Sequence, residues 1–106
     1  IDIAVGDFKV PLVLVLAHSG CLAVRQIVEG KEGPGGALRY RVQSAYYDAL
    51  AQSREAIYER TIDQNARKTC ADLLQESFAL ADEYRAQHTI IRAARYDMAT
   101  GRVVML

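Results

Sequence analysis

A histidine and a cysteine lie close together directly after the most apolar stretch of the sequence. Residues 11–17 are all apolar, and His18 and Cys21 follow them, separated by a serine and a glycine. Imidazole nitrogen and thiolate sulfur suit zinc better than magnesium or calcium, which prefer oxygen ligands. The pair therefore predicts a metal site with Zn²⁺ as its cofactor and with His18 and Cys21 as metal ligands.

Two ligands are fewer than a zinc site needs, since catalytic sites use about three protein ligands and structural sites about four. Cys70 is the only other cysteine, and its neighbours form the apolar stripe of a helix. His88 and the carboxylates show no zinc-like spacing to the first pair. We expect Cys70 to belong to the core and the missing ligand to come from elsewhere. Spacing alone also allows a buried thiol beside a loop in which His18 or Ser19 caps the next helix.

The elements around this pair follow an α/β pattern. Residues 11–17 predict a strand buried on both faces, because they form a continuous apolar run. Ligands of open α/β sheets bind beyond the carboxyl ends of such strands. Residues 21–29 predict a short helix that Gly30 ends, with its amino end at the proposed metal. A glycine-rich loop over residues 31–36 follows.

The second half of the sequence predicts two helices and a hairpin. Residues 37–60 have a helical pattern that includes four of the six tyrosines, whose rings either cover the core or form a partner site. Thr61 and Gln64 have the spacing of a capping box, which predicts the start of a long helix. Residues 89–96 and 102–106 predict two strands joined by a hairpin turn.

The composition is that of one soluble globular domain. The 106 residues are 51% hydrophobic and 25% charged, and 13 basic residues balance 13 acidic ones. Because the net charge is zero, no global field favours nucleic acid or an anionic membrane. The longest apolar run is far shorter than the ~20 residues that cross a bilayer, so we expect no membrane span. Two distant cysteines favour a reducing compartment, with the cytoplasm as the default location.

Residues 11–24 resemble the zinc-binding segment of the β-class carbonic anhydrases, in which an apolar strand runs into Gly-His-x-x-Cys-Gly-Ala. Residues 96–103 are similar to the closing hairpin of that family, with its Tyr-Asp pair and Thr-Gly turn. Residues 63–67 resemble the start of its long penultimate helix. The resemblance spans nearly the whole chain, and the His-x-x-Cys after a strand is its specific part.

The resemblance implies a single, partial β-carbonic-anhydrase-like domain over residues 1–106. The implied α/β fold has a mostly parallel central sheet flanked by helices, with an antiparallel C-terminal hairpin at one edge. The implied activity is the reversible hydration of carbon dioxide to bicarbonate by a zinc lyase, with His18 and Cys21 as zinc ligands. The implied assembly is a homo-oligomer, a dimer or larger.

The family's second motif, Cys-x-Asp-x-Arg or its Ser variant, is absent from this sequence. In the family it supplies another thiolate and an Asp-Arg pair that orients the zinc-bound water. No catalytic residue is therefore visible, and we expect these residues alone to be inactive. We also expect an incomplete sheet whose exposed strand edge and apolar surface favour association with a companion segment or subunit.

Three functions remain open at this point. The first is a zinc-dependent carbonic anhydrase that another segment completes. The second is a catalytically inactive, carbonic-anhydrase-like subunit with a structural or assembly role, and the third is another zinc hydrolase on the same scaffold. Ala17 and Leu22 replace family glycines on either side of the motif. We expect the bulk of Leu22 either to narrow the substrate pocket or to accompany a loss of catalysis.

Overall fold

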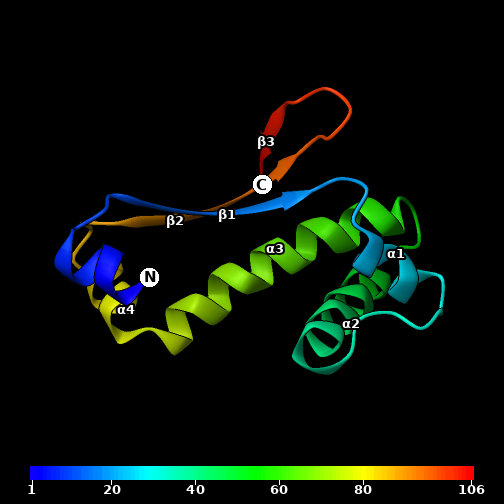
Figure 1. The fold of residues 1–106 in the computed structure, drawn as a ribbon, viewed down its shortest axis with the longest axis horizontal. Coiled ribbons are helices and arrows are strands. Elements are labelled where there is room, and N and C mark those ends of the chain that lie inside the picture. Colours follow the sequence, from blue (N-terminus) through cyan, green and yellow to red (C-terminus); the bar gives the residue numbers. More distant parts are fainter.

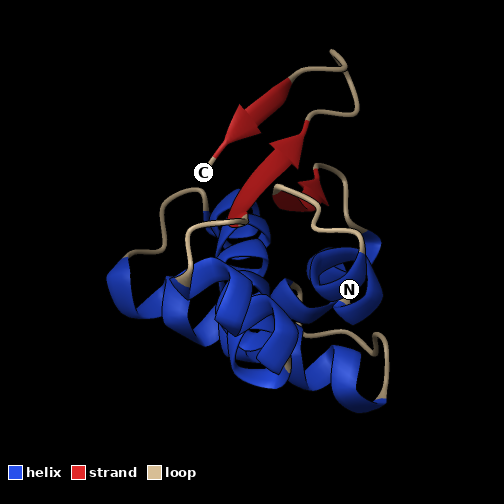
Figure 2. Ribbon diagram, turned by 90° about the vertical axis from the view of Figure 1, so that its left-hand side faces the viewer, coloured by secondary structure: helices blue, strands red, loops and turns tan.

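The computed structural model describes all residues from Ile1 to Leu106. Its elements are, in chain order, η1 (Ile3–Asp7), β1 (Leu12–His18), α1 (Leu22–Val28), α2 (Gly36–Gln52), α3 (Ile57–Glu76), α4 (Phe78–Arg85), β2 (Ile90–Tyr96) and β3 (Val103–Met105). The strands form one sheet in the order β1-β2-β3, with β1 and β2 parallel and β3 antiparallel to β2. The helices lie to one side of this sheet, and α3 runs along β1 and β2 (Figure 1, Figure 2). The predicted α/β fold with a hairpin at one edge is confirmed.

Only one face of the sheet is covered by helices (Figure 2). Val13 and Val15 are half-buried on the covered face. Leu12, Leu14 and Leu16 on the opposite face are 48%, 43% and 51% exposed. The prediction of a strand buried on both faces is wrong for this chain, because no layer packs on the outer face. The predicted exposure of apolar surface and of a strand edge is confirmed, since β1 is an edge strand.

Two small apolar clusters hold the helices against each other and against the sheet. One joins α1, α2 and α3, and the other joins η1, α4 and β2. The long α3 contributes residues to, or packs against, both clusters, so it is the common support of the fold. The buried members are Val24, Ile27, Val42 and Ile62 in the first cluster, and Val5, Leu80 and Ile91 in the second. None of the helices combines the length and the hydropathy that crossing a bilayer requires.

The boundary between α2 and α3 lies earlier in the chain than predicted. Because α3 begins at Ile57, Thr61 lies inside the helix, and its hydroxyl donates to the Ile57 carbonyl at 2.7 Å. The capping box predicted at Thr61 is therefore wrong. Arg60 provides the physical reason, because its guanidinium donates to the carbonyls of Ala49 and Ser53 at 3.0 and 2.7 Å. These bonds satisfy carbonyl groups at the end of α2 and stabilise the turn that leads into α3.

The long helix predicted after Thr61 is two helices, α3 and α4, which meet at Ser77. The Ser77 hydroxyl oxygen accepts a hydrogen bond from the Leu80 backbone N–H at 3.1 Å and so caps α4. The same hydroxyl donates to the Asp2 carboxylate, which fastens the start of the chain to this turn. A serine that can satisfy orphan donors favours a new helix start over a continuous helix.

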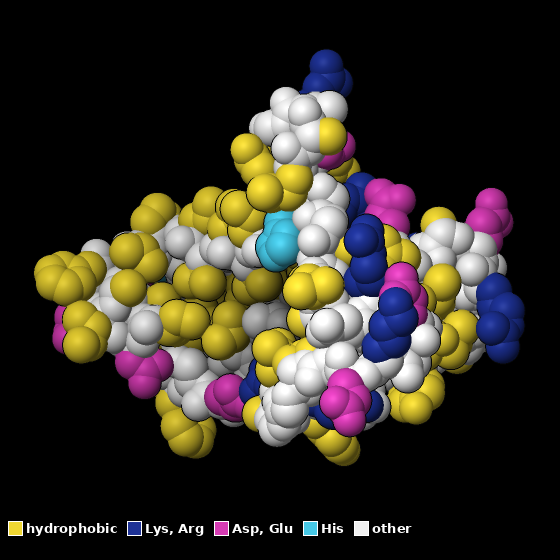
Figure 3. Space-filling model, turned by 45° about the vertical axis from the view of Figure 1, so that its right-hand side comes forward, with side chains coloured by type: hydrophobic (Ala, Val, Ile, Leu, Met, Phe, Trp, Pro, Cys, Tyr) yellow, Lys and Arg dark blue, Asp and Glu magenta, His cyan; other side chains and the backbone are white.

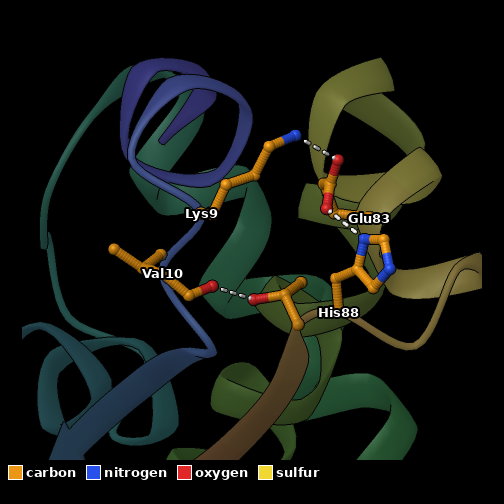
Figure 4. A network of polar contacts seen from close by, with 5 residues as sticks. Lys9, Val10, Glu83 and His88 are labelled. Carbon is orange, nitrogen blue, oxygen red and sulfur yellow. Dashed lines mark hydrogen bonds and ion pairs between the residues drawn. The ribbon is translucent and has the colours of Figure 1, made fainter.

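A network of polar contacts joins the segments that lead into β1 and β2 (Figure 4). The Glu83 carboxylate accepts a hydrogen bond from Lys9 Nζ at 2.7 Å and lies 2.9 Å from His88 Nδ1. Beside it, the Thr89 hydroxyl donates to the Val10 carbonyl at 2.6 Å. Two hydrogen bonds lower the pKa of Glu83 below its usual value. The bond from Lys9 has the largest effect, and the bond from His88 has the next largest.

Glu83→Gln is expected to destabilise the fold in a pH-dependent manner. A carboxyl group whose pKa is lowered by folding stabilises the protein above its unfolded pKa, and this contribution is lost as the pH falls through the folded value. Urea unfolding should therefore show a difference between wild type and variant that shrinks as the pH falls from about 5 to about 3. In a Lys9→Met background the same substitution should produce a weaker trend. A difference that stays constant over this range would contradict the account.

Candidate metal centre

His18 is the last residue of β1, and the loop that follows orients its ring. His18 Nδ1 lies 2.9 Å from the backbone carbonyl oxygen of Ser19. Because a carbonyl only accepts, Nδ1 is the donor in this contact. Metal-binding histidines typically donate the proton of the second ring nitrogen in this way. Nε2 is therefore the nitrogen of this exposed imidazole that could bind a metal.

Cys21 lies at the other end of the same loop, where it precedes α1 as the N-cap residue. Its backbone is extended and its side chain is half-buried. Gly20 has a φ of +68°, a left-handed conformation that favours glycine, so the chain can turn between the two candidate ligands. Both cysteines are free thiols.

Ser19 fastens this loop to the turn that joins β2 and β3. Its backbone N–H donates to the Tyr96 carbonyl at 2.9 Å, and its side-chain Oγ accepts from the Met98 backbone N–H at 2.9 Å. The interpretation in which His18 or Ser19 caps the next helix is wrong, because no side chain caps α1. Both residues instead shape the loop that carries the candidate ligands.

A cavity of about 180 Å³ lies beside the loop and against the end of edge strand β1. Asn65 of α3 contributes an amide group to a wall that is otherwise mainly apolar. Asn65 lies about one turn of α3 after the buried Ile62, and no motif of the sequence marks it as a site residue. The lining residues are Leu16, Ala17, His18, Cys21, Val24, Ile62 and Asn65.

Leu22 does not line this cavity. It is the first residue of α1, and its side chain is 65% exposed. The predicted narrowing of the pocket by Leu22 is therefore not found in this chain. The methyl group of Ala17, which replaces the other family glycine, does lie in the cavity wall.

An arginine near the loop is fully engaged in ion pairs. Arg95 of β2 lies 2.5 Å from Asp63 and 2.7 Å from Glu59, both on α3. The hydrogen bond to Asp63 is the main reason that the pKa of Arg95 is raised above its usual value. Because two carboxylates neutralise this guanidinium, it does not provide a free cation to the cavity.

His18 and Cys21 line the same cavity, and the structure adds no third donor. No group of three or more His, Cys, Asp or Glu side chains could hold a metal ion. Cys70 packs against the cluster around Leu80, as predicted for a core residue, and burial raises the pKa of its thiol. Imidazole and thiolate are a donor set that fits zinc, and they are about half of the set that a complete site needs.

Known proteins are similar to this chain in sequence and in fold. The family described as carbonic anhydrase matches residues 1–103 of the chain. This chain belongs to the β-carbonic anhydrase family. The resemblance found in the sequence is thereby confirmed. The β-carbonic anhydrases are zinc enzymes.

Three relatives show how much of a family member is present. The carbonic anhydrase of Mycolicibacterium smegmatis is 33% identical over an alignment of 109 residues, gaps included, which covers 97% of this chain and 52% of the relative. The β-carbonic anhydrase CafD of Aspergillus fumigatus has a TM-score of 0.78 at 18% identity, over 98% of this chain and 61% of that one. A tetrameric β-carbonic anhydrase of Sordaria macrospora has a TM-score of 0.79 at 17% identity, over 99% and 56%. The chain therefore spans about half of the curated relative that it matches.

Proposed function

We propose that this chain is the part of a zinc-dependent carbonic anhydrase that carries the ligands His18 and Cys21. The proposed reaction of the complete protein is the reversible hydration of carbon dioxide to bicarbonate. The observation that carries the proposal is the loop geometry: an imidazole with a free Nε2 and a half-buried thiol border the same mainly apolar cavity. Membership of the β-carbonic anhydrase family supports the assignment of the reaction.

In this proposal the residues of the chain bind the metal and form a mainly apolar wall beside it. His18 binds as a neutral imidazole and Cys21 as a thiolate, so metal binding depends on pH and releases protons. Zinc held by these residues would supply Lewis acidity, which makes water a nucleophile at about neutral pH. The apolar residues Val24 and Ile62 line the cavity, which suits a small uncharged molecule such as carbon dioxide.

The remaining ligands are proposed to come from a companion segment or from another subunit. The Cys-x-Asp-x-Arg motif of the family is absent from these residues, which span 52% of the M. smegmatis relative. The free edge of β1 lies beside the cavity that His18 and Cys21 line. A strand that pairs in parallel with β1 would bring its own carboxyl end to this cavity.

We propose that the native protein is a homo-oligomer. The outer face of β1 presents Leu12, Leu14 and Leu16 to solvent, and hydrophobic side chains gather over much of the face drawn in Figure 3. Large exposed apolar patches mark interaction sites. The S. macrospora relative is tetrameric. The proposed location stays the cytoplasm, which suits two free cysteines.

A carbon dioxide hydration assay tests the proposed function. The native protein with its metal should be active, whereas residues 1–106 alone should be inactive because the metal ligands are incomplete. In the native protein, His18→Ala should lower kcat/KM by at least about 100-fold, since zinc provides most of the activation of water. His88→Ala is the matched control, because His88 contacts Glu83 at the far end of the sheet. The control should keep its activity.

One observation favours the alternative of a catalytically inactive assembly subunit, namely the presence of only two metal donors in the loop. The same assay distinguishes the two proposals. Native protein that hydrates no carbon dioxide, with about one zinc per chain or with none, would contradict the enzyme and favour the assembly subunit.

A further inference from the structure

The backbone of Cys21 is held by a tyrosine from another helix. The Tyr58 hydroxyl of α3 donates a hydrogen bond to the Cys21 carbonyl at 3.0 Å. The same carbonyl accepts the Arg25 backbone N–H at 3.0 Å, as the first hydrogen bond of α1. Both lone pairs of this carbonyl are therefore used.

We propose that Tyr58 is a positioning residue, which fixes Cys21 relative to His18. The relevance of this role to metal binding rests on the proposed function, in which these two residues bind zinc. The loop itself gives Cys21 little support. Ser19 fastens the His18 end to the hairpin, but Gly20 follows and no side chain caps α1. The bond from Tyr58 is the only side-chain hydrogen bond that Cys21 receives.

Tyr58 is itself fixed from several sides, as a positioning residue must be. Its ring packs against the apolar cluster of α1, α2 and α3. The Arg25 guanidinium lies over the ring, 5.6 Å from its centre, in a cation–π contact. Ala56, two residues earlier, has a φ of 47°, which is unfavourable for a residue with a Cβ. The fold therefore maintains, against local preference, the turn that presents Tyr58 to the loop.

The hydrogen bond affects the site through preorganisation. Metal sites keep their affinity when surrounding contacts hold the ligands in the binding geometry. Without the hydroxyl of Tyr58, the Cys21 backbone can move away from α3. The thiol then samples positions from which it cannot bind the same metal ion as His18. The fold as a whole keeps its packing, because the ring of the tyrosine remains.

Tyr58→Phe tests this role, with Tyr46→Phe as the matched control. Tyr46 packs against the same cluster, but its hydroxyl makes no hydrogen bond within the chain. In the metal-free native protein, amide hydrogen exchange over residues 19–25 should be about five-fold faster in Tyr58→Phe, the factor that corresponds to one hydrogen bond of about 1 kcal/mol. It should change less than about two-fold in Tyr46→Phe. The zinc affinity of Tyr58→Phe should be about ten-fold weaker, at a nearly unchanged melting temperature.

Each result of these measurements either supports or contradicts the positioning role of Tyr58. Unchanged exchange in the loop, or faster exchange spread evenly over the chain, would overturn the positioning role. If the wild type binds zinc and Tyr58→Phe binds it with equal affinity, the positioning role is overturned as well. If exchange rises only in the loop while even the wild type binds no zinc, Tyr58 does position Cys21 and the proposed zinc function fails instead.

Discussion

Cys21→Ser in the native protein is expected to weaken zinc binding by at least about 100-fold. Serine has nearly the same size as cysteine, but its hydroxyl stays protonated at neutral pH and is a poor zinc ligand. Loss of a hydrogen bond that orients a metal ligand typically weakens metal binding by about 10–100-fold. Loss of the ligand itself should weaken it at least as much. Competition with a chromophoric chelator measures this affinity.

Cys70→Ser is the control for this substitution. Cys70 packs against the apolar cluster around Leu80, and it does not line the cavity beside His18. Its replacement should lower stability slightly and leave the zinc affinity within about two-fold of wild type. Equal losses in both variants, or full affinity in Cys21→Ser, would contradict the assignment of Cys21 as a ligand.

Asp63→Ala is expected to lower the free energy of unfolding by about 2–3 kcal/mol. The side chains of Asp63 and Arg95 are only 15% and 16% exposed, and they form the ion pair that ties α3 to β2. Removal of one partner from a buried pair costs about 3–5 kcal/mol, because the other charge stays buried. Glu59, which is 55% exposed, also contacts Arg95 and should compensate part of this loss.

Asp48→Ala provides the comparison, and urea unfolding measures both variants. Asp48 pairs with Lys68 at 2.7 Å, but these side chains are 48% and 34% exposed. Water and salt screen such a pair, so its loss should cost no more than about 1 kcal/mol. If the two variants lost equal stability, the burial of the Asp63–Arg95 pair would not be what stabilises the contact between α3 and β2.

The strands and the candidate ligands could be predicted because their signals are local. The apolar run of residues 11–17 and the turn between residues 96 and 102 place the strands within a residue or so of where they lie. His18 and Cys21 are near neighbours in the chain, so their proximity needs no knowledge of the fold. The exposure of Leu12, Leu14 and Leu16 could not be predicted, because an apolar run does not say what covers its second face.

The wrong or missing predictions concern features that depend on contacts between residues far apart in the chain. The capping box at Thr61 is absent because Arg60 reaches back to the end of α2. The roles of Tyr58 and Asn65 depend on how α3 packs beside the loop, and Tyr58 is 37 residues away from Cys21 in the chain. A single sequence carries no local signal for such a contact.

We propose that His18 and Cys21 are half of a zinc site that another segment completes. X-ray absorption at the zinc edge of the native protein tests this most directly, because it counts the sulfur and imidazole ligands of each zinc. We predict one zinc per chain with two sulfur ligands and one imidazole, and one sulfur ligand fewer in any zinc that Cys21→Ser retains. Native protein without zinc, or with zinc that has the same sulfur ligands in wild type and Cys21→Ser, would contradict the account.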